Sequence, residues 1–406
     1  MRLDIKKLLL IILFVAIVAG AGYAIYYFFF RGPAVPAPTE EEETVPTGQL
    51  PEAGAGQLPE GAEDAAEQLA LPTASSVAKG GLTQVESITP TVTTENATLG
   101  GDGMSMQFYN PATGVFGKVL ADGTMQNLSD EIFYNVENVT WSKDGTNAIL
   151  EYPDGSNIVY DFQSKKQVTL PKHWENFAFS PQGDQIAALS MGIDPDNRWL
   201  FISDRDGSNA QAIEPLGNNA DKVQVDWSPN NQIIATSRTG QAMGIDRQQV
   251  LLVGKHGENF PGLTVEGWGF DYKWSTTGDR MVYNVYNTKS NYNPTVWVVD
   301  ASGNNIGQNR KQIKINTWAE KCTFSNNTTL FCAVPDYLPE GTGLQPSLAD
   351  NIPDTIYKID VVTGKKSAIG KPEDAPTIKS LSVSSDGKYI FYVDRATNRI
   401  NKMRLK

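Results

Sequence analysis

One pattern recurs seven times after residue 97, and it constrains the fold more than any other feature of the chain. Each copy has an apolar alternation that ends in an aromatic or aliphatic residue, then a short polar turn usually built on serine, then a second apolar run. The clearest copies are Val-Thr-Trp-Ser-Lys-Asp-Gly at 139–145 and Phe-Ala-Phe-Ser-Pro-Gln-Gly at 177–183; the others begin at 97, 225, 272, 322 and 381. Two apolar runs around such a turn predict a β-hairpin.

The spacing of the copies predicts how many strands each repeat contains. Successive copies begin about 38 to about 59 residues apart, the period of a blade with four strands. A second pair of apolar runs lies between copies, as at 157–162 and 167–170. We therefore predict an all-β chain folded as a seven-bladed β-propeller over residues 81–406, with six or eight blades as alternatives if the copy at 97 is misread.

The Ser-Pro-Asp-Gly-like turn after an aromatic residue resembles the repeat of TolB-like and WD-repeat-like β-propellers. The resemblance covers about three quarters of the chain, and it implies a propeller fold and a scaffold that binds other proteins. Several copies depart from the pattern: proline is absent from most, and Asn231 and Thr328 stand where glycine is expected. The extra α/β domain of TolB has no counterpart in this sequence, so the partners of TolB are not transferred.

A propeller must join its first and last blades, because unpaired sheet edges promote aggregation. The last copy supplies only three strands, which end at 400–405. The segment at 82–88, just before the first copy, has the pattern of a single strand. We expect this segment to complete the seventh blade.

The N-terminal residues predict a membrane anchor followed by a spacer. Residues 8–30 form an apolar run long enough to cross a bilayer. Residues 1–7 carry Arg2, Lys6 and Lys7, which places the N-terminus in the cytoplasm and the propeller outside. The alternative is a signal peptide cleaved near residues 19–21. Residues 31–80 are rich in Pro, Ala, Gly and Glu, a composition that predicts a disordered linker.

Charge and motifs exclude several functions. A net charge of −12 argues against nucleic-acid binding, and two His and two Cys leave little for a zinc site. The sequence contains no nucleophile elbow, P-loop or dinucleotide fingerprint, so we predict no catalytic residue, no metal and no cofactor. Cys322 and Cys332 flank one predicted hairpin turn; they are expected to form a disulfide, with two buried thiols as the alternative.

The connections between the second and third strands differ among blades. They are short in copies one, two and seven, but insertions occupy residues 191–198, 238–247, 286–294 and 334–353 of copies three to six. In a propeller these loops emerge on one face, beside the connections between blades. They contain the Arg, Tyr, Trp and Met residues that binding surfaces favour. The candidate partner-binding residues are Trp174, Arg198, Arg238, Met243, Arg247, Trp268, Tyr286, Tyr292, Trp318 and Tyr337.

Two hypotheses of function follow. The first is a membrane-anchored, extracytoplasmic β-propeller that acts as a protein–protein interaction scaffold in the cell envelope and binds a protein or peptide partner. The second is a carbohydrate-binding or glycan-hydrolysing propeller. A broad surface would favour the first, and a deep channel mouth with paired acids and a stacking aromatic would favour the second. The sequence does not identify the partner.

Overall fold

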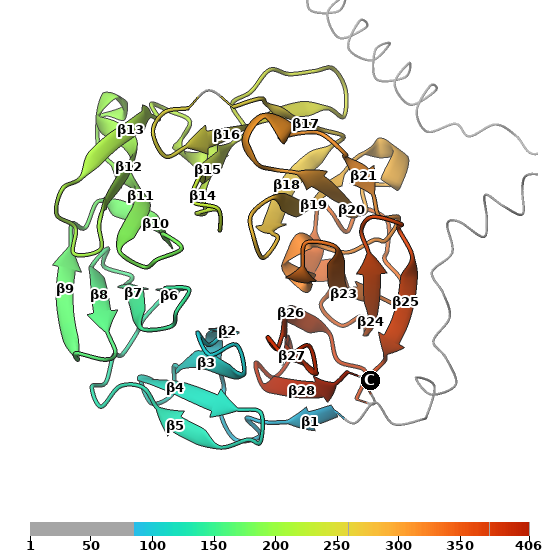
Figure 1. The fold of residues 1–406 in the computed structure, drawn as a ribbon, viewed down its shortest axis with the longest axis horizontal. Helices are drawn as coiled ribbons and strands as arrows, with labels where there is room; N and C mark the ends of the chain where they lie inside the picture. The colour runs from blue at the N-terminus through green and yellow to red at the C-terminus, as the bar shows by residue number, and fades with distance from the viewer. Residues whose placement is uncertain (1–84, 259, 373, 406) are drawn as a thin grey trace, which may run out of the picture. The chain divides into compact units, whose positions relative to one another are not determined.

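The computed structural model describes residues 85–405 except 259 and 373, and it arranges them as a ring of seven four-stranded antiparallel sheets (Figure 1). The prediction of an all-β, seven-bladed propeller is therefore confirmed, and the alternatives of six and eight blades are wrong. The predicted membrane span at 8–30 and the predicted linker at 31–80 lie outside the described residues. Among the residues that are described, no helix has the length and apolar character needed to span a bilayer.

The strands of the first four blades follow the chain in order. Blade 1 has β2 (Glu95–Leu99), β3 (Ser105–Asn110), β4 (Val115–Leu120) and β5 (Met125–Asn127). Blade 2 has β6 (Asn138–Trp141), β7 (Asn147–Glu151), β8 (Asn157–Asp161) and β9 (Lys166–Leu170). Blade 3 has β10 (Trp174–Phe179), β11 (Gln185–Met191), β12 (Arg198–Asp204) and β13 (Gln211–Pro215). Blade 4 has β14 (Val223–Val225), β15 (Ile233–Ser237), β16 (Gln248–Gly254) and β17 (Leu263–Val265).

The remaining three blades complete the ring. Blade 5 has β18 (Trp268–Trp274), β19 (Arg280–Tyr286), β20 (Thr295–Asp300) and β21 (Lys311–Gln312). Blade 6 has β22 (Cys322–Asn326), β23 (Thr329–Pro335), β24 (Asp354–Asp360) and β25 (Lys366–Gly370). Blade 7 has β26 (Ile378–Val383), β27 (Tyr389–Asp394), β28 (Ile400–Arg404) and β1 (Val85–Ser87). Short 3-10 helices lie in the connections: η1 (Pro195–Asn197), η2 (Ala220–Lys222), η3 (Thr288–Ser290), η4 (Gly303–Asn305), η5 (Ala319–Lys321) and η6 (Pro346–Ala349).

The repeated polar turn holds the two inner strands of each blade together. In blade 2 the hydroxyl of Ser142 donates to Asp144 at 2.6 Å and accepts from the backbone N–H of Asn147 at 2.9 Å. Gly145 has a φ of +68°, and a Cβ there would come within 2.2 Å of Gln107 in blade 1. The turn therefore needs glycine for both its conformation and the close approach of the neighbouring blade. In blade 4, Asn231 takes a φ of +62° in place of glycine.

The hydrophobic core is divided among the spaces between neighbouring blades. The second strands are buried on both sides, because each blade has a neighbour on either side: in β7, Ala148 and Leu150 pack with residues of blade 1, and Ile149 packs with residues of blade 3. This two-sided burial explains why the second strands have continuous apolar runs instead of an apolar–polar alternation.

The ring closes as predicted from the segment at 82–88. Strand β1 pairs antiparallel with β28, with Val85 opposite Met403 and Ser87 opposite Asn401, so one N-terminal strand completes the last blade. Residues 82–84 of the predicted segment lie outside the described residues, and β1 ends at Ser87. Ile88 donates its N–H to the carbonyl of Ile400 at 3.0 Å, and the hydroxyl of Thr89 accepts from the Ile400 N–H at 2.8 Å, which extends the closure beyond the strand.

Replacing Thr89 with valine should weaken this closure. Thr89 is fully buried, so the substitution leaves the N–H of Ile400 without its acceptor and should lower the free energy of unfolding by about 1–2 kcal/mol. Urea unfolding followed by tryptophan fluorescence measures this loss. Thr113→Val, at an exposed turn of blade 1, is the control and should leave stability within about 0.5 kcal/mol. Equal stability of the two variants would contradict a role for Thr89 in closing the ring.

Candidate partner-binding face

The alternation of strand directions divides the connections of the ring between two faces. One face carries the connections between blades and those between second and third strands, and we call it the loop face. The opposite face carries the turns between first and second strands and between third and fourth strands, and we call it the turn face. All four sequence insertions lie on the loop face, as the connections β11–β12, β15–β16, β19–β20 and β23–β24. Strand β1 runs toward the loop face, so the chain enters the ring at Val85 from the turn face.

The insertions of blades 4 and 5 are joined to each other. Asp246 of the β15–β16 loop accepts from the backbone N–H of Thr288 at 3.3 Å and also from the Thr288 hydroxyl. Asp246 has a φ of +60°, a left-handed conformation that aspartate tolerates better than most residues.

The insertions of blades 5 and 6 are joined more extensively. The N–H of Gly343 donates to the carbonyl of Tyr292 at 2.7 Å, and the N–H of Gly341 donates to the carbonyl of Asn291 at 2.9 Å. A Cβ at Gly343 would lie 2.6 Å from both the carbonyl oxygen of Tyr292 and Cβ of Tyr286, so the two loops pack without space for a side chain at this position. The β19–β20 and β23–β24 loops therefore form one unit.

Arg395 extends this connected surface to blade 7. Its guanidinium pairs with Asp350 of the β23–β24 loop at 3.1 Å and with Glu320 at 3.2 Å. Hydrogen bonds and ion pairs thus join the loop of each blade to that of the next, from blade 4 to blade 7. A surface that is already ordered loses less entropy when it binds a partner.

The structure places eight of the ten predicted site residues at least partly at the surface of the loop face. Tyr337, Trp268 and Met243 are 65, 45 and 43% exposed. The remaining five are Arg238 and Arg247, which are exposed, and Arg198, Tyr286 and Tyr292, which are half-buried. Three of the arginines are held by neighbouring groups: Arg198 donates to the carbonyl of Gly192, Arg238 to that of Asp221, and Arg247 pairs with Glu266.

Two predicted residues must be corrected, because they are core residues. Trp174 is 7% exposed and packs on Phe201 with ring centroids 4.3 Å apart. Trp318 is 9% exposed and packs with Ala349 and Ile352 beneath the β23–β24 loop. Both are adjacent to loop-face connections in the sequence, but neighbouring side chains cover them.

Sequence analysis missed several exposed apolar residues on the same face. Ile193 and Ile245 are 101 and 89% exposed, and Leu344 and Leu348 are 60 and 43% exposed. Ile132 and Tyr134 add to them from the connection between blades 1 and 2, at 54 and 61% exposure. The sequence signal that could have identified these residues is an aliphatic residue inside an otherwise polar insertion. Clustered exposed apolar side chains mark interaction surfaces more reliably than single ones.

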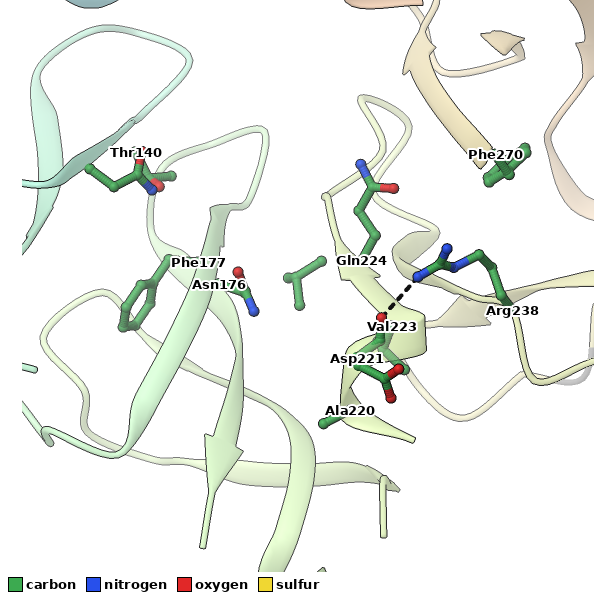
Figure 2. A pocket seen from close by; sticks show the side chains of 11 residues that line it. Thr140, Asn176, Phe177, Ala220, Asp221, Val223, Gln224, Arg238 and Phe270 are labelled. Atoms are coloured by element: carbon green, nitrogen blue, oxygen red, sulfur yellow. Dashed lines mark hydrogen bonds between the residues drawn. The ribbon is translucent and has the colours of Figure 1, made fainter. Parts of the chain in front are cut away.

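A pocket of about 440 Å³ opens among the first strands of blades 2 to 5 (Figure 2). Asn176, Gln224 and Arg238 line it with polar groups. Figure 2 shows Arg238 reaching across to the backbone of Asp221, where the bond measures 2.9 Å. The pocket has the size of a small ligand site, and its lining offers amide and guanidinium donors.

Asp226 has a carboxyl group whose pKa is strongly raised. It follows β14, and its side chain faces Trp274, Asp271 and Lys273 of β18. Burial raises the pKa of Asp226 to about 7, the Asp271 carboxylate adds to the rise, and the indole N–H of Trp274 and the Lys273 ammonium oppose it. The carboxyl group therefore changes its charge near neutral pH.

Lys321 and Asp354 form a buried ion pair within blade 6. The ammonium lies 2.8 and 3.1 Å from the two carboxylate oxygens, and the residues are 1 and 0% exposed. Asp354 also accepts from the backbone N–H of Ile378 at 2.6 Å, where blade 7 begins. The pair therefore holds two blades together next to the β23–β24 loop.

Cys322 and Cys332 lie opposite each other in the β22–β23 hairpin and are joined by a disulfide of 2.07 Å. The bridge closes a short loop, so replacing both cysteines with alanine should lower the free energy of unfolding by about 2–3 kcal/mol. Thiol titration of the denatured, unreduced protein should find no free thiol. Titration of two thiols would contradict the disulfide. The control is the Ala187→Cys variant, which adds a thiol at a buried site of blade 3 and shows that the assay detects a single free thiol.

Comparisons with known proteins show the fold class. No protein-family profile and no curated protein matches the chain. Among solved structures, an oligogalacturonate lyase in complex with manganese has a TM-score of 0.58 at 13% identity, over 80% of this chain and 93% of the lyase chain. A chain of a mitotic checkpoint complex has a TM-score of 0.50 at 12% identity, over 90% and 99%. TolB from Acinetobacter baumannii has a TM-score of 0.41 at 12% identity, over 75% and 63%.

At these identities the likeness to the lyase and to the checkpoint chain shows a shared β-propeller fold and leaves activity open. Within residues 85–405, outside the two positions not described, no three His, Cys, Asp or Glu side chains form a group that could hold a metal ion. The class of protein is thus a seven-bladed β-propeller with one cross-linked, partly apolar loop face.

Proposed function

We propose that this protein is a membrane-anchored, extracytoplasmic interaction scaffold of the cell envelope, which binds a protein or peptide partner through its loop face. The observation that carries the proposal is that the insertions of blades 4 to 6 are cross-linked and expose apolar side chains such as Ile245, Tyr337 and Leu344. Such a surface is broad and preordered, as protein partners require.

The position of the chain entry supports the same proposal. The chain joins the ring at Val85 from the turn face, so a tether formed by residues 31–80 would leave the loop face free to meet a partner. Anchoring through residues 8–30, with a cytoplasmic N-terminus, remains part of the proposal. This orientation is tested with a cysteine introduced at residue 3 or at residue 40. The measurement is whether a membrane-impermeant thiol reagent reaches each cysteine.

Site-specific photo-cross-linking in the native host tests the binding face. A photoreactive residue at Trp268 or Tyr337 should give a cross-linked adduct of one defined mass, because both side chains are exposed on the loop face. The matched control is Lys143, which is exposed on the turn face. In the Arg238→Ala/Tyr292→Ala/Tyr337→Ala variant, the adduct at Trp268 should be lost while the melting temperature is kept. Adducts that form only from Lys143 would place the partner elsewhere.

The carbohydrate alternative has one specific observation in its favour, the channel-side pocket lined by Asn176, Gln224 and Arg238. Its two aromatic residues, Phe177 and Phe270, are 6 and 5% exposed, so they offer little surface for stacking on a sugar. Oligogalacturonate with manganese is the first substrate to test, because a lyase of this name shares the fold. Cleavage that Arg238→Ala abolishes would favour the alternative over the scaffold.

A further inference from the structure

A positively charged surface lies on the outer edge of blade 6, away from the insertions of the loop face. We call it the lysine patch; it consists of Lys311, Lys314, Lys365 and Lys366. The first three are exposed, and Lys366 is half-buried. Among the described residues, no carboxylate lies within ion-pair distance of any of the four.

The four lysines come together around the hairpin of β24 and β25. Lys366 donates to the carbonyl of Lys314 at 3.2 Å, and Lys311 donates to the carbonyl of Val362 at 3.0 Å, so two residues of blade 5 reach the hairpin of blade 6. Lys366 lies opposite Ile359 of β24, on the face of the sheet that packs toward blade 5. Burial and the nearby charge of Lys314 lower the pKa of Lys366, as expected for positive charge that is not neutralised.

One carboxylate does lie in the hairpin, and one of its oxygens holds the turn. Asp360 Oδ1 accepts from the backbone N–H groups of Val362 and Thr363, both at 2.9 Å. These bonds, together with the charge of Lys311, lower the pKa of Asp360 and keep it ionised, and the patch with Asp360 still has a net charge of +3.

Blade 2 provides an internal comparison. It has the same Lys-Lys pair at the corresponding turn, as Lys165 and Lys166; there Lys165 forms an ion pair with Asp130, while Lys166 has no ion pair among the described residues. Lysines at a sheet edge often serve only to prevent strand pairing. That role would be served equally in both blades, so it does not explain why the lysines accumulate unpaired around blade 6.

A groove of about 480 Å³ adjoins the patch between blades 5 and 6. Lys311, Val361 and Val362 line one part of it, and Arg280, Asp300 and Arg310 line another. Arg280 pairs with Asp300 and Arg310 with Glu266, so within the described part of the chain Lys311 is the cation of the groove without an ion pair. Val362 is 58% exposed, which gives the groove an apolar contact beside its cations. Strand β25 is the last strand of its sheet, so its outer edge has no strand partner among the described residues. An extended polypeptide can add to such an edge through its backbone.

We propose that the lysine patch and the adjoining groove bind an acidic peptide segment of a protein partner, in extended conformation along β25. Carboxylates of the segment pair with the lysines, and an apolar side chain contacts Val362. This surface is separate from the loop face, so the ring can hold two partners at once. A flat anionic surface would reach the lysines but would not enter the groove.

Fluorescence anisotropy with the full chain in a neutral detergent tests the proposal. The probe is a labelled 12-residue peptide of alternating glutamate and valine, and peptides that alternate lysine or glutamine with valine are the controls. Only the glutamate peptide should bind. The Lys311→Gln/Lys314→Gln/Lys365→Gln/Lys366→Gln variant should bind it about tenfold more weakly, since four exposed ion pairs together contribute about 1.4 kcal/mol.

The matched control is Lys165→Gln/Lys166→Gln in blade 2, which should change the affinity less than twofold. Both variants alter exposed or half-buried side chains, and unchanged melting temperatures show that they fold. Val362→Ser should weaken binding of the glutamate peptide but not of inorganic polyphosphate. If the blade 2 and blade 6 variants bound the glutamate peptide with equal affinity, the proposal would be overturned. Polyphosphate binding without peptide binding would also overturn it, because it would show only a general affinity for anions.

Discussion

Replacing Asp354 with alanine should lower the free energy of unfolding by about 3–5 kcal/mol. The substitution leaves the ammonium of Lys321 buried without its carboxylate, which lies 2.8 Å away in the intact protein. It also removes the acceptor of the Ile378 N–H, at the start of blade 7. Both losses act at the boundary between blades 6 and 7. Urea or thermal unfolding followed by circular dichroism measures the effect.

An exposed ion pair provides the control for this prediction. Asp154 and Lys172 are 2.9 Å apart, with side chains 62 and 64% exposed, so Asp154→Ala should cost much less stability than Asp354→Ala. The double variant Lys321→Met/Asp354→Leu should recover most of the stability, because it removes both charges from the interior. A loss below about 1 kcal/mol for Asp354→Ala would show that water reaches the pair.

Much of the fold could be predicted from sequence because it rests on local signals that are repeated. The polar turn at 142–145 uses Ser142, Asp144 and Gly145 for bonds within a few residues, and the same chemistry recurs in most of the other blades. The closing strand was also predictable, since the last copy lacks a fourth strand and only residues 82–88 could supply it. The pairing of β1 with β28 agrees with that count.

The candidate site was less predictable, because it depends on which way each side chain points. The insertion lengths placed the loops on one face, but Trp174 and Trp318, which follow connections of that face, are buried. Lys321 and Asp354 are 33 residues apart, and no sequence pattern links them. The lysine patch draws on two blades, so it appears only when the ring brings Lys314 to Lys366.

The second large effect expected is a loss of stability on raising the pH, caused by Asp226. Its pKa is about 7 in the folded protein, well above the ordinary value of 3.8, because burial disfavours the carboxylate. The folded protein therefore keeps this proton between pH 4 and pH 7, where the unfolded chain loses it. The stability from this proton is fully present below pH 4 and is lost as the pH rises to 7. The full shift corresponds to about 4 kcal/mol, and partial exposure of Asp226 reduces this to about 3 kcal/mol.

The Asp226→Asn variant isolates this contribution, because asparagine stays neutral at every pH. The variant should match the natural chain in stability near pH 4 and exceed it by about 3 kcal/mol at pH 8. Asp386→Asn is the control of opposite sign: bonds from Ser384 and the Lys388 N–H lower the pKa of Asp386, so its removal should reduce stability at pH 8. Urea unfolding at several pH values between 4 and 8 gives both differences. Parallel stability curves for Asp226→Asn and the natural chain would show that Asp226 is ionised throughout this range.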